Sequence, residues 1–243
     1  MSTNPIIIKN LHEEYVDGAG LKIHLFKNIS FEVERNSITV MVAAKGAGKS
    51  ALLKIIAGLE EPSSGEISIP KENTIYIPSK PSSFPWLSVK ENIIYGMPQV
   101  SESEFKNIIA LTGLDGYEDH FPNNKSFGFR FRISLGRALI RKPELILLDE
   151  PIDNMEPETK FEIYSLVRKI KQNSKVTFLI ATSDINEALL LADQIYIMSR
   201  LPGEIKAQFK IDLPVNRDSR VMLSPEFISH KNEIEKKYVN ISF

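Results

Sequence analysis

The sequence contains no cysteine, so disulfide bonds and thiolate metal sites are excluded. Histidine is also scarce, with 4 in 243 residues. His12, His24, His120 and His230 show no spacing typical of metal ligands. The linear sequence therefore predicts no metal site built from cysteine or histidine.

Long apolar runs are absent as well. A membrane-spanning helix needs roughly 18 apolar residues, and the runs at 40–44 and 188–192 are far shorter. Residues 1–8 do not combine a basic segment with a long apolar run, so we expect no secretory signal. We expect a cytoplasmic protein whose membrane role, if it has one, depends on a partner.

Neither sign of charge is in excess. Lysine and arginine total 30, aspartate and glutamate total 31, and the formal net charge is −1. This balance argues against a broad nucleic-acid surface, so we expect no nucleic-acid partner. Apolar residues make up 42%, enough for a sizeable core.

Two segments carry the strongest functional signal. Residues 43–50, AAKGAGKS, are typical of a phosphate-binding loop, and residues 145–151, LILLDEP, predict a buried strand that ends in two carboxylates. Each has an ordinary alternative, a glycine-containing strand–helix turn for the first and a solvated strand end for the second. Their combination in one chain favours a site for a nucleoside triphosphate with magnesium.

The residue types assign roles within this site. Backbone N–H groups at a helix N-terminus bind phosphate oxygens, and Gly46 and Gly48 let the backbone approach. We expect Lys49 to reach the β- and γ-phosphates, Ser50 and Asp149 to hold Mg²⁺, and Glu150 to polarise the attacking water. The residues expected to contact the nucleotide from this loop are Lys45, Gly46, Ala47, Gly48, Lys49, Ser50 and Ala51.

Ala43 departs from the usual loop pattern, G-x-x-x-x-G-K-[ST], which has glycine at this position. If the backbone there is left-handed, alanine costs roughly 1–2 kcal/mol. We expect the phosphate pocket to survive this change, with weaker affinity if the strain is present.

Alternating apolar strands and amphipathic helices predict an α/β fold with a mostly parallel sheet and flanking helices. Predicted strands cover 6–8, 29–33, 38–42, 66–69, 74–77, 145–148, 176–181 and 195–199. Predicted helices cover 50–57, 89–95, 102–112, 127–141, 158–171, 185–192 and 224–238. The succession of helices in 102–141 breaks the alternation and predicts an inserted helical subdomain. The last helix has alternating charges, which also fits a solvated cap.

Several further segments carry a family resemblance. They are Phe84-Pro85-Trp86-Leu87-Ser88-Val89, Glu91-Asn92-Ile93, Arg137-Ala138-Leu139 with Pro143, Ile211-Asp212-Leu213-Pro214 and Ser224-Pro225-Glu226-Phe227. Together with the two nucleotide motifs, they make the chain resemble the ATP-binding cassette of ABC transporters, of the nitrate, sulfonate, taurine and bicarbonate importer type. The resemblance covers nearly the whole chain.

This resemblance implies a P-loop NTPase fold in a single cassette, with an antiparallel β appendage. Residues 1–78 and 143–205 would form the nucleotide-binding core, 79–142 the Q-loop and helical subdomain, and 206–243 a C-terminal extension. ATP and Mg²⁺ are the implied cofactors. Tyr15 matches the aromatic residue that stacks on adenine; the alternative is a half-buried strand tyrosine, since stacking and packing favour the same residue.

The implied partners are a second ABC cassette, in a hetero- or homodimer, and a transmembrane permease. The permease would contact residues near Phe84, Pro85, Trp86 and Leu87, which would make the protein peripheral on the inner face of the cell membrane. A partly buried aromatic loop explains the same four residues equally well. An exposed aromatic flanked by proline is nevertheless a common interface anchor.

The chain departs from the family pattern at several positions. The family's glutamine falls on Ser79, its catalytic histidine on Ser183, and the aspartate after the second strand on Glu156. The signature L-S-G-G-Q falls on residues 125–129, where only Ser126 and Gly128 match. Alternatively, Phe127 and Phe129 simply pack within a diverged loop.

These departures leave several functional hypotheses. The chain is an importer ATPase with weak turnover, serving as the degenerate half of an asymmetric pair, or it is a non-hydrolysing structural or regulatory ATP-binding subunit. An unrelated P-loop enzyme, such as a small-molecule kinase, is a third possibility, but no acceptor-binding motif is visible.

Overall fold

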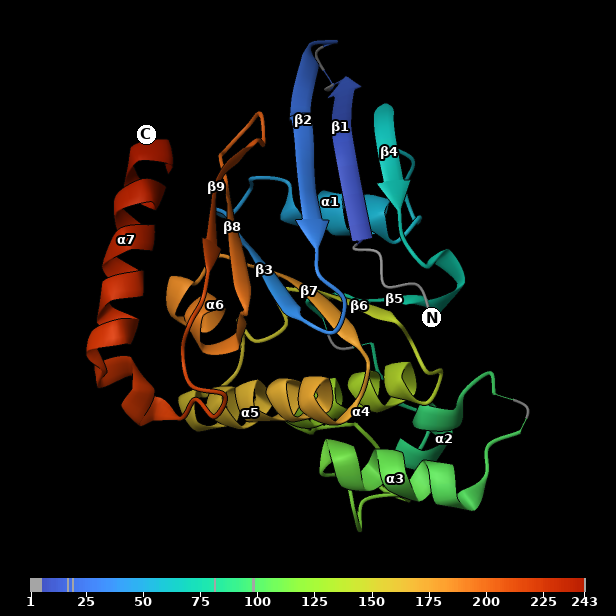
Figure 1. Cartoon of the computed structure of the whole chain (residues 1–243). Coiled ribbons are helices and arrows are strands. Elements are labelled where there is room, and N and C mark those ends of the chain that lie inside the picture. Colours follow the sequence, from blue (N-terminus) through green and yellow to red (C-terminus); the bar gives the residue numbers. More distant parts are fainter. Residues whose placement is uncertain (1–5, 17, 19, 81, 98, 243) are drawn as a thin grey trace.

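The main sheet of the computed structural model has six strands in the order β5-β6-β7-β3-β8-β9 (Figure 1). The model describes the chain except residues 1–5, 17, 19, 81, 98 and 243. The strands are β5 (Thr74–Ile77), β6 (Leu145–Asp149), β7 (Thr177–Thr182), β3 (Ile38–Val42), β8 (Gln194–Met198) and β9 (Ile205–Lys210). All neighbours pair in parallel except β8 and β9, which confirms the predicted α/β class.

A second, antiparallel sheet covers one face of this core, as the resemblance implies. It has the order β2-β1-β4, with β1 (Ile6–Val16), β2 (Lys22–Val33) and β4 (Ser64–Ser68). Helix α1 (Lys49–Ile56) lies beneath it (Figure 1). Buried side chains such as Ile8, Phe31, Leu52, Met41 and Leu147 form one continuous apolar cluster. This cluster ties the small sheet and α1 to one face of the main sheet.

Helices cover the opposite face of the main sheet. They are α4 (Phe127–Leu139), α5 (Pro157–Asn173), α6 (Ile185–Leu191) and α7 (Pro225–Ser242). Val40, Ile146 and Ile180 point into this second cluster from the sheet. Because the parallel strands are buried on both faces, they are continuous apolar runs in the sequence.

The helical subdomain lies at the lower right of Figure 1. Helices α2 (Val89–Ile94) and α3 (Glu102–Thr112) pack beside α4 around a separate core that includes Val89, Phe105 and Ile133. This confirms the predicted insertion between the two nucleotide motifs. Two short 3₁₀ segments, Lys71–Asn73 and Ser219–Leu223, complete the assigned helices.

Three strands differ clearly from the predictions, the first being β1, which runs to Val16 rather than ending near residue 8. β2 begins at Lys22 rather than near residue 29, and the edge strand β9 was not predicted. Residues 205–210 alternate between half-buried and exposed, so in the sequence they look like a polar surface segment. Only their pairing with β8 makes them a strand. Within the described residues, no helix has the length and apolar character needed to cross a bilayer.

Candidate nucleotide-binding site

The loop of residues 43–48 joins the carboxyl end of β3 to the first turn of α1. Gly46 and Gly48 have φ values of +81° and +91°, which strongly favour glycine. A Cβ added at Gly48 would also approach Phe26 Cε1 to 2.9 Å, whereas one at Gly46 would meet nothing within 4 Å. The two glycines therefore let the loop turn tightly between β3 and α1.

Ala43 is not strained in this loop. Among the described residues, the non-glycine positions with positive φ are Asn10, Asn28, Asn36, Asn124, Lys142 and Glu150. Ala43 is fully buried and donates its N–H to the Thr182 carbonyl at 3.2 Å. The strain considered from the motif is therefore absent, because this position of the loop has ordinary backbone angles.

Lys49 lies at the first position of α1 with only 5% of its side chain exposed. Its Nζ donates to the carbonyls of Ala43 and Ala44 at 2.8 and 3.0 Å, and forms an ion pair with Glu150 Oε1 at 2.9 Å. A buried ammonium requires such partners. The same contacts fix the ammonium at the mouth of the loop, where a phosphate would bind.

Asp149 ends β6, which is separated from β3 by β7 in the sheet order. Its Oδ2 accepts a hydrogen bond from Tyr76 Oη at 2.9 Å. Burial, followed by the negative charge of Asp149, raises the pKa of Tyr76, which keeps this phenol a donor. Asp149 Oδ1 is buried and has no hydrogen-bond partner within the described part of the chain. An orphaned carboxylate oxygen beside a phosphate loop fits a Mg²⁺ site.

Glu150 adopts a left-handed backbone conformation, with φ of +42°. Its N–H donates to the Ala181 carbonyl at 2.8 Å, and its Oε2 accepts from the Ser183 N–H at 3.2 Å. Because Lys49 contacts Oε1, both oxygens of the Glu150 carboxylate have a partner. Strain of this kind in a non-glycine residue often marks a functional position.

A cavity of about 440 Å³ opens above the loop. Its lining residues are Lys45, Gly46, Gly48, Lys49, Ser50, Ala51, Ser79, Glu150, Asp153 and Asn154. The volume falls within the range usual for small-molecule sites. Most of the residues predicted from the loop thus meet around one space, while Ala47 is buried behind it.

Besides Ala47, three predicted nucleotide contacts lie outside this cavity lining, and so does the predicted magnesium ligand Asp149. Tyr15 stands near the end of β1, opposite Ile23 of β2, and is 46% exposed. Ser126 and Gly128 belong to the start of α4, where Ser126 Oγ accepts from the Phe129 N–H at 3.2 Å. These residues therefore do not share a cavity with Lys49 within this chain.

The aromatic residues at the start of α4 have different environments. Phe129 packs edge-on against Tyr117, with ring centroids 5.4 Å apart. Phe127 is 37% exposed, and Arg130 Cζ lies 5.8 Å from its ring centroid. Local packing therefore accounts for Phe129, but it leaves Phe127 exposed in the first turn of the helix.

The 84–87 segment is held from within the helical subdomain. Asn92 is fully buried, and its Nδ2 donates to the carbonyls of Phe84, Leu87 and Ser88 at 2.9–3.0 Å. Its Oδ1 accepts from the Phe84 N–H at 2.7 Å. Trp86 remains 70% exposed on this rigid loop.

Sequence reasoning missed Tyr76, Asp153, Asn154 and the positioning role of Asn92. Asp153 and Asn154 follow the predicted carboxylates within four residues, and that proximity is the only signal they offer. Tyr76 gives no linear signal, because it reaches Asp149 only through the pairing of β5 with β6.

Comparisons with known proteins agree with this geometry. The ABC transporter family model matches residues 26–153. The chain is 30% identical to the nitrate import ATP-binding protein NrtD of Synechocystis sp., over 93% of this chain and 92% of that protein. It is 35% identical to the aliphatic sulfonates import ATP-binding protein SsuB of Bacillus cereus, over 80% and 82% of the two chains.

Solved structures show the same fold. A dimeric ATP-binding cassette bound to ADP and phosphate has a TM-score of 0.73 at 23% identity, covering 86% of this chain and all of that one. CbiO1 of Clostridium perfringens, part of the ABC transporter complex CbiONQ, has a TM-score of 0.75 at 22% identity, covering 96% and 97%. With its phosphate loop, paired carboxylates and helical subdomain in this arrangement, the chain belongs to the ABC transporter family as an ATP-binding cassette.

Proposed function

We propose that this chain is the ATP-binding subunit of an importer, and that it couples MgATP binding at the 43–50 loop to solute uptake through a membrane permease. The meeting of Lys49, Ser50 and Glu150 around one cavity, with Asp149 next to Glu150 at the end of β6, carries this proposal. The names of the similar proteins, which import nitrate, aliphatic sulfonates or taurine, support import as the direction.

Each residue has a task that its position supports. Lys49 exchanges its contact with Glu150 for the β- and γ-phosphates, which the loop N–H groups also bind. Ser50 and Asp149 hold Mg²⁺, which neutralises phosphate charge. Glu150, released from Lys49, orients and polarises the attacking water.

We propose that hydrolysis is slow. Ser183 offers only a short hydroxyl in place of an imidazole, and its backbone N–H already holds Glu150. Ser79 lines the cavity but is too short to act as the family's glutamine does. Loss of one positioned transition-state contact commonly lowers the rate by about 10²–10³-fold.

The signature region adds a second impairment. Phe127 places a ring in the first turn of α4, where the family has a small residue that admits the phosphate bound by the partner cassette. If the partner is a complete cassette, this chain weakens one composite site through Ser79 and Ser183, and the other through Phe127. The chain would then be the degenerate half of an asymmetric pair. In a homodimer both sites would carry every defect.

The alternative is a non-hydrolysing structural or regulatory ATP-binding subunit. Measuring MgATP affinity and steady-state hydrolysis on the same sample separates the two proposals. Saturable binding with slow turnover that disappears in Glu150→Gln supports the weak ATPase. Binding without turnover supports the regulatory subunit. Ordinary ABC-type turnover would refute degeneracy, and the absence of saturable binding would refute both.

We also propose that the loop containing Phe84, Pro85, Trp86 and Leu87 contacts the permease and keeps the protein on the inner face of the membrane. The exposure of Trp86 and the rigid support from Asn92 favour this role. Exposed aromatic anchors on preorganised loops bind partners with little loss of conformational entropy.

A further inference from the structure

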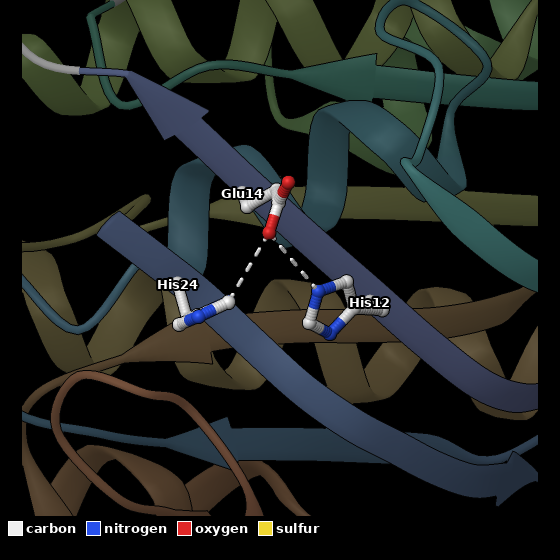
Figure 2. Close-up of side chains that lie close together, drawn as sticks. All are labelled: His12, Glu14 and His24. Carbon is white, nitrogen blue, oxygen red and sulfur yellow. Dashed lines mark ion pairs between the residues drawn. The ribbon is translucent and has the colours of Figure 1, made fainter. Parts of the chain in front are cut away.

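A cluster of metal-ligating side chains lies on the β1–β2 hairpin, apart from the residues that line the nucleotide cavity. It consists of His12 and Glu14 from β1 and His24 from β2 (Figure 2). Residues 12 and 14 share a face of β1 because side chains alternate along a strand, and His24 is the direct cross-strand neighbour of Glu14. The hairpin register thus joins residues that the linear spacing keeps apart.

Both imidazoles approach the same oxygen of Glu14. Glu14 Oε2 lies 3.4 Å from His24 Nδ1 and 3.7 Å from His12 Nε2, and Figure 2 shows both contacts converging on it. These distances exceed the usual N···O hydrogen-bond range of about 2.7–3.2 Å. They are close to the separation of about 3.4 Å between neighbouring ligands of a tetrahedral Zn²⁺ with bonds near 2.0–2.1 Å.

The cluster needs little movement to close around an ion. One ligand atom from each side chain lies within 4.8 Å of the others. The two imidazole rings are tilted by 53° at a centroid distance of 5.4 Å, so they do not stack face to face. The β1–β2 register shifts between Glu13 and Glu14, and beyond that shift Glu14 and His24 face each other directly. Rotation of the three side chains can therefore shorten the distances between their ligand atoms.

Lys22 is the nearby cation that would oppose metal binding. Its Nζ contacts Glu14 Oε1 at 2.8 Å, on the oxygen that the imidazoles do not share. Lys22 therefore offsets the negative charge of the Glu14 carboxylate but leaves its Oε2 available as a metal ligand.

We propose that His12, Glu14 and His24 form a surface site for a divalent ion of the Zn²⁺ class, which crosslinks β1 to β2. Two imidazole nitrogens and one carboxylate oxygen are a ligand set that favours zinc over magnesium or calcium. The partial exposure of all three side chains gives the ion a path from solvent.

Titration of the metal-free full-length protein with Zn²⁺, in the absence of nucleotide, tests this site. Calorimetry should show saturable binding of a single equivalent. Removing a residue that only hydrogen-bonds to a metal ligand lowers metal affinity by about 10–100-fold. Removing a ligand itself, as in His12→Ala or His24→Ala, should therefore weaken binding by at least about tenfold. His120→Ala removes an exposed histidine elsewhere and is the matched control, with unchanged affinity expected.

A second measurement separates this site from adventitious binding at Asp149 and Glu150. Zn²⁺ should raise the melting temperature of the wild type and of His120→Ala, but not that of Glu14→Gln, which keeps the shape of the side chain. Circular dichroism establishes that each variant is folded. The proposal is overturned if no saturable binding occurs, or if the His12, Glu14 and His24 variants bind Zn²⁺ as the wild type does.

Discussion

Lys49 and Glu150 form a buried ion pair, with 2.9 Å between Nζ and Oε1, across the phosphate loop and the end of β6. The two residues are 101 positions apart in the sequence, and in the proposed function each is needed for a different step. While they are paired, Lys49 occupies one oxygen of the Glu150 carboxylate. Nucleotide binding would therefore separate the pair and release the carboxylate.

Lys49→Ala tests the phosphate role. We expect MgATP affinity to fall at least tenfold, because a hydrogen bond to a charged group contributes about 1.5–3 kcal/mol. Fluorescent-nucleotide titration measures this change. Lys54→Ala is the matched control, because Lys54 lies on the same helix, pairs with Glu60 at 3.0 Å and does not line the nucleotide cavity. Equal losses in the two variants would contradict a specific role for Lys49.

Ser183→His tests whether the missing imidazole limits turnover. A positioned transition-state contact contributes up to about 10²–10³-fold in rate, so kcat should rise while MgATP affinity changes little. Adding Glu150→Gln to this variant should remove the gain, because the carboxylate is still required. A kcat unchanged by Ser183→His, measured in the cassette dimer, would show that another defect limits the rate.

Trp86→Ala tests the permease contact. We expect weaker co-purification with the membrane subunit and unchanged MgATP affinity, because Trp86 is exposed and does not line the nucleotide cavity. Leu223→Ala, which removes an exposed apolar side chain before α7, should have no effect on either. Unaltered co-purification of Trp86→Ala would count against the proposed contact.

Gly128 and Thr159 provide a test of how α4 packs on α5. A Cβ at Gly128 would collide with Thr159 Cγ2. Overpacking costs about 1–3 kcal/mol, which exceeds the roughly 0.5–1 kcal/mol that alanine gains over glycine in a helix. Gly128→Ala should therefore lower stability in urea denaturation. Thr159→Ser removes Cγ2, so the double variant should recover the stability that Gly128→Ala loses. If the stability losses of the two single variants simply add in the double variant, the contact is disproved.

Glu187 should make stability depend on pH. It is buried in α6, and burial, followed by the charges of Asp184 and Glu150, raises its pKa from 4.5 to about 8. Between these values the folded state binds more protons than the unfolded state, so stability falls as pH rises. The loss is complete once the pH exceeds about 8.

Glu187→Gln removes this titration. Melting temperatures of the wild type and the variant, measured from pH 5 to pH 9, should therefore diverge in favour of the variant as pH rises toward about 8, and the difference should then level off. A difference that stays constant over this range would show that Glu187 titrates normally.

The phosphate loop was predictable because its information is local. An apolar strand, glycines at 46 and 48, and a helix follow one another directly in the sequence. The chemistry of a triphosphate restricts which residue types can occupy these positions. The same holds for Asp149 and Glu150, which follow a recognisably buried strand. The edge strand β9 was missed because its character depends on pairing with β8.

By itself, the sequence determined the α/β class, the phosphate loop, the paired carboxylates and the family. Tertiary structure alone decided that Ala43 is unstrained, that Tyr76 supports Asp149, and that Lys49 pairs with Glu150. It also decided that His12, Glu14 and His24 share one face of a hairpin. The physical reason is that local spacing sets backbone conformation, whereas strand order and register choose which distant side chains meet.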